Sequence, residues 1–251
     1  MPEESQPLIR CDGLVKRYPV KSGVFGRMTG SVHAVDGVTL RVNRGETYSL
    51  VGESGCGKST TGRMFLLLER PTAGGVVMDG ADVTRLRGAG LKRFRRRVQA
   101  VFQDPFSSLN PRMTVGAIVE EGMTIHRPRM TQSEKRDRAA ELLALTGLDG
   151  TALDRYPHEF SGGQRQRVGL ARALSTDPEF IVADEAVSAL DVSIQAQIIN
   201  LLQSLQERLG VAYLFIAHDL AVVRHLSHRV GVMYLGHLME EGGAAEVFDE
   251  P

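Results

Sequence analysis

One segment constrains the fold of this chain more than any other: Gly52-Glu53-Ser54-Gly55-Cys56-Gly57-Lys58-Ser59, which fits the pattern G-x-x-x-x-G-K-S/T. An apolar stretch ends directly before it at Val51, and a helical pattern follows it as far as Leu68. Glycines in such a turn let backbone N–H groups surround phosphate oxygens, and the N-terminus of the following helix adds the positive end of its dipole. The segment therefore predicts an α/β fold with a phosphate-binding loop between a strand and a helix.

The residues of this loop have distinct predicted roles. Lys58 supplies a positive charge for the β- and γ-phosphates of a nucleotide, and the Ser59 hydroxyl is suited to bind Mg²⁺. The strand and helix on either side argue against a glycine-rich turn that binds nothing. The predicted nucleotide contacts here are Gly52, Ser54, Gly55, Cys56, Gly57, Lys58, Ser59 and Thr60.

Apolar runs rich in β-branched residues alternate with helical patterns, which is typical of α/β organisation. After Asp191, apolar residues recur at spacings of three and four up to Leu209, which predicts an amphipathic helix that Gly210 ends. Residues Pro19–Ser31 are glycine-rich and irregular, and predict a loop. The predicted strands are Val32–Val42, Thr47–Val51, Gly75–Met78, Val98–Phe102, Phe180–Ala183, Val211–Ala217, Arg229–Leu235 and His237–Glu241.

The middle of the chain has a different character. It contains helical patterns at Val115–Met123, Ser133–Thr146 and Ser161–Ser175, with little sign of strands. We therefore predict an α/β core made of residues 1–105 and 177–251, with a helical subdomain of residues 106–176 inserted into it.

Charge and composition exclude several classes of protein. Lys plus Arg and Asp plus Glu both total 30, so the formal net charge is zero, and we predict no nucleic-acid partner. The basic run at Lys92-Arg93 and Arg95-Arg96-Arg97 is interpreted as a solvated helix face, with a phosphate or RNA patch as the alternative. Two cysteines are too few for a disulfide framework and fit a reducing cytosol. The longest apolar run is far short of the roughly 20 residues that cross a bilayer, and the N-terminus shows no secretory signal.

A pair of carboxylates follows the apolar run Phe180–Ala183. Asp184 is suited to hold Mg²⁺, directly or through water, and Glu185 is placed to polarise an attacking water. Acids at the end of a strand are often only solvated, but the phosphate-binding loop upstream favours the functional interpretation. This end of a strand is also where ligands bind in open α/β sheets.

The segment Phe160-Ser161-Gly162-Gly163-Gln164-Arg165-Gln166-Arg167 resembles the signature motif of ATP-binding cassette (ABC) ATPases, commonly L-S-G-G-Q. Phe160 replaces the usual leucine. Ser161 is also a good N-cap, and two glycines at the start of a helix let its backbone approach an anion closely. The resemblance implies a P-loop NTPase core with a mixed sheet and an inserted helical subdomain. It also implies that Ser161, Gly162, Gly163 and Gln164 contact nucleotide.

Other segments are similar to motifs of the same family. Gln103 resembles the Q-loop glutamine that contacts Mg²⁺ and water, and Ser188-Ala189-Leu190-Asp191 resembles the D-loop. His218 resembles the switch histidine that senses the γ-phosphate, and Tyr18 resembles the aromatic residue that stacks on adenine. The resemblance thus implies catalytic roles for Glu185, His218 and Gln103. Ser59, Gln103 and Asp184 are the implied metal ligands.

Three longer segments resemble the dipeptide and oligopeptide importer branch, also called the peptide/nickel branch: Tyr18–Val38, Phe102–Arg112 and Ala186–Gln197. Ala186 stands where the family usually has proline, so we expect Glu185 to be held less rigidly.

The resemblance implies an ATPase subunit that uses ATP and Mg²⁺ to energise uptake of peptides or a related small solute. The implied partners are integral-membrane permease subunits, a second ABC cassette in a homodimer or heterodimer, and indirectly a solute-binding protein. The implied location is the cytoplasmic face of the cell membrane, as a peripheral subunit. An ABC ATPase that serves a soluble enzyme complex is the alternative. Phe106, Leu109 and Met113 are expected either to contact the permease or to pack inward.

Overall fold

The computed structural model describes residues 6–22, 27–103 and 108–249. Backbone contacts divide the chain into two compact units. The first consists of residues 1–86 with 212–251, and the second consists of residues 87–211. The predicted helical subdomain, residues 106–176, therefore lies within the second unit.

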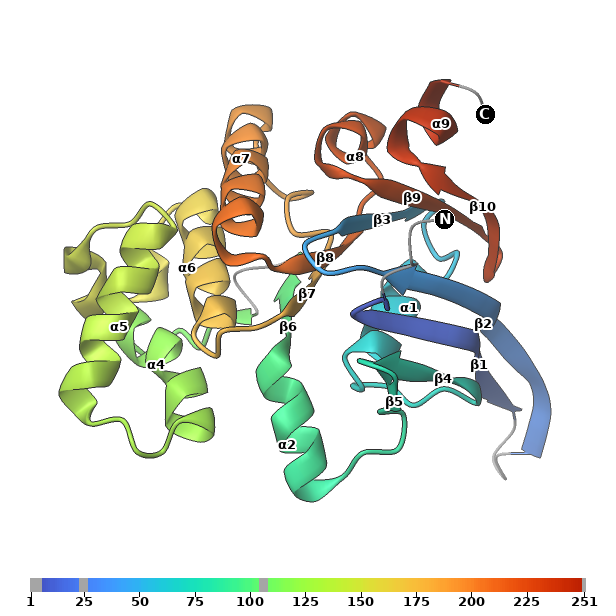
Figure 1. Cartoon of the computed structure of the whole chain (residues 1–251), viewed down its shortest axis with the longest axis horizontal. Helices are drawn as coiled ribbons and strands as arrows, with labels where there is room; N and C mark the ends of the chain where they lie inside the picture. Colours follow the sequence, from blue (N-terminus) through green and yellow to red (C-terminus); the bar gives the residue numbers. More distant parts are fainter. Residues whose placement is uncertain (1–5, 23–26, 104–107, 250–251) are drawn as a thin grey trace. The chain divides into compact units, whose positions relative to one another are not determined.

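A long antiparallel ribbon forms one part of the first unit (Figure 1). β1 (Ile9–Ser22) pairs on one side with β2 (Arg27–Val42) and on the other with β4 (Ala73–Met78). The short β5 (Ala81–Asp82) extends this sheet beyond β4. Side chains of β1 and β2 that face inward, such as Leu14 and Val38, are fully buried.

The prediction of a loop at Pro19–Ser31 is wrong, because all the described residues of this range belong to β1 or β2. Pro19 lies opposite Ser31 in the β1–β2 ladder. The ladder between β1 and β4 ends at Val15, so β1 has an open edge at Pro19. Proline is tolerated at such an edge because its missing N–H breaks no ladder bond.

The second part of the first unit is a sheet in the order β10-β9-β3-β8. β3 (Thr47–Gly52) lies parallel between β8 (Ala212–Ile216) and β9 (Arg229–Tyr234), and β10 (His237–Gly243) returns antiparallel to β9. Every residue of β8 is buried, as its continuous apolar run predicts. The helices of this unit are α1 (Lys58–Phe65), α8 (Leu220–Leu226) and α9 (Ala244–Asp249).

The second unit combines a parallel strand pair with helices. β6 (Val98–Phe102) pairs with β7 (Phe180–Asp184). α4 (Val115–His126), α5 (Gln132–Leu145) and α6 (Gly162–Leu174) pack against one another (Figure 1). In the described residues, this unit also contains α2 (Gly88–Arg97), α7 (Val192–Leu209) and the 3-10 turns η1 (Gly150–Asp154) and η2 (Pro157–Glu159).

The predicted helix after Asp191 is confirmed as α7. It ends at Leu209, and Gly210 caps it in the left-handed conformation with φ of 67°. Across the described residues, none of the helices combines the length and the apolar character that crossing a membrane requires.

Candidate nucleotide site

The predicted phosphate-binding loop connects β3 to α1, and its glycines are required by close backbone contacts. Gly52 and Gly57 have φ of 145° and 111°. A Cβ on Gly52 would lie 2.1 Å from the carbonyl oxygen of Met233 in β9, and one on Gly57 would lie 2.2 Å from that of Ala34 in β2. Because any side chain would collide with backbone at both positions, only glycine permits this loop.

Lys58 stabilises the same loop from inside. Its side chain is buried, and its ammonium group donates hydrogen bonds to the carbonyl oxygens of Gly52 at 2.7 Å and Glu53 at 2.8 Å. The Sγ atom of Cys56 lies 3.7 Å from the same nitrogen. A positive charge is therefore held where the loop turns.

The start of α1 also suits an anion. Lys58 is the first residue of α1, and the first turn of the helix contains no acidic residue that would neutralise the positive end of its dipole. Ser59 and Thr60 are half-buried in this turn. A glycine turn, a fixed ammonium group and a helix N-terminus together match the chemistry of a polyphosphate.

Tyr18 lies beside the same helix. Its hydroxyl group donates to the carboxylate of Glu69, and the Thr60 hydroxyl is a second hydrogen-bond partner. Lys16 lies over the Tyr18 ring, with its Nζ atom 5.0 Å from the centroid. Burial, followed by the contact with Glu69, raises the pKa of Tyr18. The structure therefore places this predicted aromatic next to the phosphate-binding loop.

His218 lies at the same edge of the sheet as this loop. β3 and β8 are parallel neighbours, with Leu50 opposite Ile216, so their carboxyl ends meet. Gly52 ends one of these strands, and His218 follows the other by two residues with its side chain exposed. The first unit thus brings together Tyr18, the loop and His218.

The second unit brings together a different set of predicted residues. Phe102 at the end of β6 pairs with Asp184 at the end of β7. Gln103 directly follows the first strand and Glu185 directly follows the second. Because parallel strands end at one edge, Gln103, Asp184 and Glu185 share that edge.

The backbone at Glu185 has an unusual conformation. Its φ is 51°, a value that residues other than glycine adopt only with strain. Its carbonyl oxygen accepts hydrogen bonds from the N–H of Ser188 at 3.1 Å and from the Ser188 hydroxyl at 3.0 Å. Ala186 is buried. Hydrogen bonds from Ser188 thus fix the turn at which the family usually has proline.

The predicted signature segment begins α6. Ser161 is the N-cap, and its hydroxyl accepts from the N–H of Gln164 while the Gln164 side chain accepts from the N–H of Ser161. A Cβ on Gly163 would lie 2.4 Å from Ile194 in α7, and one on Gly162 would lie 3.4 Å from Leu190. The glycines therefore let the start of α6 pack closely against the D-loop and α7.

Two residues near these groups were not predicted from the sequence. Glu69 holds Tyr18 across a separation of 51 residues. Arg172 in α6 donates to the carbonyl oxygen of Ser108 at 2.5 Å and so ties α6 to the segment after Gln103. Neither residue belongs to a recognisable motif, so no sequence pattern indicated these contacts.

The segment Phe102–Met113 contains the three apolar residues that were expected either to contact the permease or to pack inward. Leu109 is buried and packs inward. Met113 is half-buried, and Phe106 lies outside the described residues.

Comparisons with known proteins agree with these features. Residues 35–188 match the family model described as ABC transporter. The oligopeptide transport ATP-binding protein AppF of Bacillus subtilis is 54% identical over 247 residues, which cover 98% of this chain and 75% of that protein. The glutathione import ATP-binding protein GsiA of Pectobacterium atrosepticum is 52% identical over 252 residues, which cover all of this chain but 40% of that longer protein.

A solved structure extends the agreement to the fold. The ATP-binding cassette MJ0796, solved as a dimer in a post-hydrolysis state with ADP and Pi, matches 94% of this chain with a TM-score of 0.82 and 32% identity, over 98% of its own length. The predicted P-loop NTPase fold class is therefore confirmed. With its sequence and its fold in agreement, the chain belongs to the ABC transporter family, as an ATP-binding cassette of the peptide/nickel importer branch.

Proposed function

We propose that this chain is the ATP-hydrolysing subunit of an importer and that it couples ATP to the uptake of peptides or a related small solute. The observation that carries the proposal is the presence of two structural features in one cassette. These are a lysine-centred phosphate-binding loop and a helix capped by Ser161 of the signature. The chain also aligns over nearly its whole length with AppF, a protein of oligopeptide transport.

The two groups of residues have complementary proposed roles. Lys58 and the start of α1 bind the phosphates of ATP, and the ring of Tyr18 stacks on the adenine. Glu185 polarises the attacking water, while His218 and Gln103 sense the γ-phosphate and position the water.

Mg²⁺ completes the proposed site. Ser59, Gln103 and Asp184 would hold it, and when bound it neutralises charge on the phosphates. No group of three or more His, Cys, Asp or Glu side chains in the described residues is arranged to hold a metal.

Two cassettes are proposed to act together. Ser161, Gly162, Gly163 and Gln164 would contact the nucleotide bound by the loop of a second cassette. The relative MJ0796 is dimeric in its solved structure. The remaining proposed partners are permease subunits and, indirectly, a solute-binding protein. The complex would act at the cytoplasmic face of the membrane. The transport relatives AppF and GsiA favour this function over service to a soluble enzyme complex.

Two substitutions test the proposal by separating nucleotide binding from hydrolysis. Lys58→Ala removes a charge-assisted contact, so its affinity for Mg-ATP falls by a factor of roughly 10 to 100. Glu185→Gln keeps the shape of the side chain and removes its charge, so ATP still binds while hydrolysis falls by at least about a hundredfold. Calorimetry measures binding, and phosphate release measures hydrolysis.

Lys135→Ala is the matched control, because Lys135 belongs to α5 and not to the proposed site. It should leave both measurements unchanged. Near-normal phosphate release by Glu185→Gln would contradict the role of Glu185, and unchanged affinity in Lys58→Ala would contradict the nucleotide site.

A further inference from the structure

Four cations on α2 have no role in the proposed function. Lys92, Arg93, Arg95 and Arg96 are exposed, while Phe94 is buried and anchors the helix. These four residues are called the α2 cationic face below. Arg97, the remaining cation of the helix, pairs with Glu179. α2 contains no acidic residue, and no ion pair forms to the α2 cationic face from any residue that the structure describes.

Neighbouring helices add further positive charge instead of neutralising it. Burial, and then Lys92 and Arg96, lower the pKa of His126 at the end of α4. Burial, and then Arg96 and Arg138, lower the pKa of Arg127. The contributions of Lys92 and Arg96 reflect cations that lie near these two residues, and α2 and α4 are in contact, so α2 and the end of α4 form one positive region.

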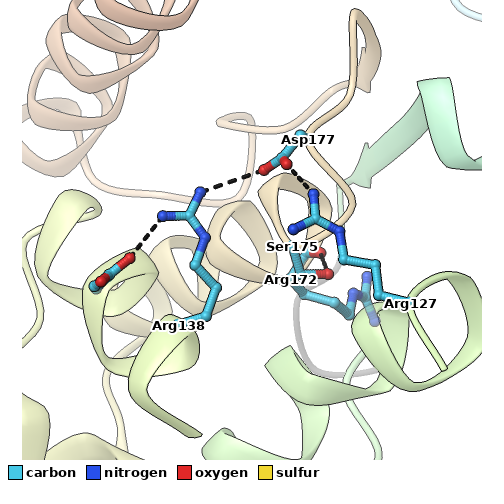
Figure 2. Close-up of polar contacts among 6 residues, drawn as sticks. Arg127, Arg138, Arg172, Ser175 and Asp177 are labelled. Carbon is cyan, nitrogen blue, oxygen red and sulfur yellow. Dashed lines mark hydrogen bonds and ion pairs between the residues drawn. The ribbon is translucent and has the colours of Figure 1, made fainter. Parts of the chain in front are cut away.

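The acidic partner of Arg127 is shared with a second arginine. Asp177 receives both Arg127 and Arg138, the latter at 3.3 Å, as Figure 2 shows. Arg138 also pairs with Glu141 at 2.7 Å. This carboxylate is therefore engaged by two guanidinium groups and forms no ion pair with the α2 cationic face.

The chemistry of the exposed side chains discriminates between classes of partner. Sequence-specific recognition of single-stranded RNA relies largely on the stacking of bases on aromatic rings, but Phe94 is the only aromatic residue of α2 and is buried. A protein partner needs apolar anchors at the centre of the interface, and the exposed residues of α2 are cations, small residues and no large apolar side chain. A diffuse layer of phosphate groups needs only flexible cations.

We propose that the α2 cationic face binds the phosphate headgroups of anionic phospholipids at a membrane surface. The proposed function enters this inference only by placing the protein near a membrane. Each cation near such a surface strengthens binding by about fivefold, so four of them suit a reversible contact that supplements a permease.

Flotation of this chain with lipid vesicles tests the inference without permease or ATP. One set of vesicles is pure phosphatidylcholine, and in the other about a third of the lipid is phosphatidylglycerol. We expect binding to the anionic vesicles only, and weaker binding as salt is raised. Lys92→Gln combined with Arg96→Gln should lower the partition coefficient by about 25-fold.

Arg70→Gln combined with Arg208→Gln is the control, because it removes the same charge from exposed positions outside α2. Less than a twofold change is expected from it. Equal losses in the two double variants would overturn the inference, as would equal binding to both kinds of vesicle. Binding of polyuridylate with no binding of anionic vesicles would also overturn it, in favour of RNA. ATP hydrolysis by the Lys92/Arg96 variant should stay normal. Vesicle binding and ATP hydrolysis can therefore fail independently, so a failure of this inference is distinguishable from a failure of the proposed function.

Discussion

Glu69 illustrates at the scale of one residue how Tyr18 is positioned in the candidate site. Besides the Tyr18 hydroxyl, it contacts Lys16 at 3.4 Å and Arg63 at 3.6 Å. Burial alone would raise the pKa of Glu69, but hydrogen bonds from Tyr18 and Lys16 and the charges nearby lower it. The ionised form of Glu69 is therefore the form that the folded state favours.

The sign of this shift predicts an acid-dependent stability. A carboxyl group with a lowered pKa stabilises the fold above its ordinary value of 4.5, and this stabilisation is lost as the pH falls through the folded-state pKa. Glu69→Gln should thus lower the free energy of unfolding by up to about 1 kcal/mol near neutral pH. Urea unfolding at a series of pH values measures the difference from the unmodified protein. The difference should shrink below about pH 4, and a gap that stays constant with pH would contradict the role of Glu69.

At the scale of an element, the cap at the start of α6 leads to a prediction about stability. Ser161 caps the helix reciprocally with Gln164. Ser161→Ala removes this cap and should cost about 1 kcal/mol of stability, while Ser161→Thr should retain most of it. Ser133→Ala is the control, since Ser133 is exposed in the first turn of α5 and Thr131 is the cap there. Equal unfolding midpoints for Ser161→Ala and Ser133→Ala would show that the cap contributes nothing.

Elements with regular patterns could be predicted from the sequence, and irregular ones could not. β6 has the predicted bounds, and α7 ends where Gly210 indicates. β1 was missed because its ladder with β2 shifts register around Leu14 and again near Lys16, which breaks the alternation that marks a strand. Glycine and proline residues in the outer part of the β1–β2 ribbon made its sequence resemble a loop.

The candidate site shows the same division. Its loop and its signature were predicted because consecutive residues carry the chemistry. The partner of Tyr18 could not be predicted, because Glu69 is distant in sequence and only the fold brings it close. Packing also decides that Leu109 is buried and Met113 only half-buried. Because both residues are apolar, the sequence does not distinguish between them.

For the whole molecule, the proposed coupling of ATP to transport requires a contact with the permease. Arg172 fixes Ser108, and Leu109 packs inward beside it. Met113 remains half-buried, so it is the described residue of this segment that we expect to contact a permease helix.

Met113→Ser should therefore reduce solute uptake by the assembled transporter severalfold while ATP binding by the isolated chain stays normal. Vesicles that contain the complete complex measure uptake, and calorimetry measures ATP binding. Leu109→Ala is the contrasting variant, because loss of a buried leucine should destabilise the fold by about 2–5 kcal/mol. Unchanged uptake by Met113→Ser would show that the permease contact lies in another segment.

The lysine at the centre of the phosphate-binding loop has a consequence for repeated turnover. Its ammonium group binds two carbonyl oxygens of the loop, and backbone from β2 and β9 encloses the glycines. The loop therefore keeps its shape through contacts within the chain. In the proposed function, an arriving nucleotide would exchange partners around an existing charge, and departure of the product would restore the earlier ones. An ATPase that exchanges its nucleotide in every cycle therefore does not lose the conformational entropy of ordering this loop each time.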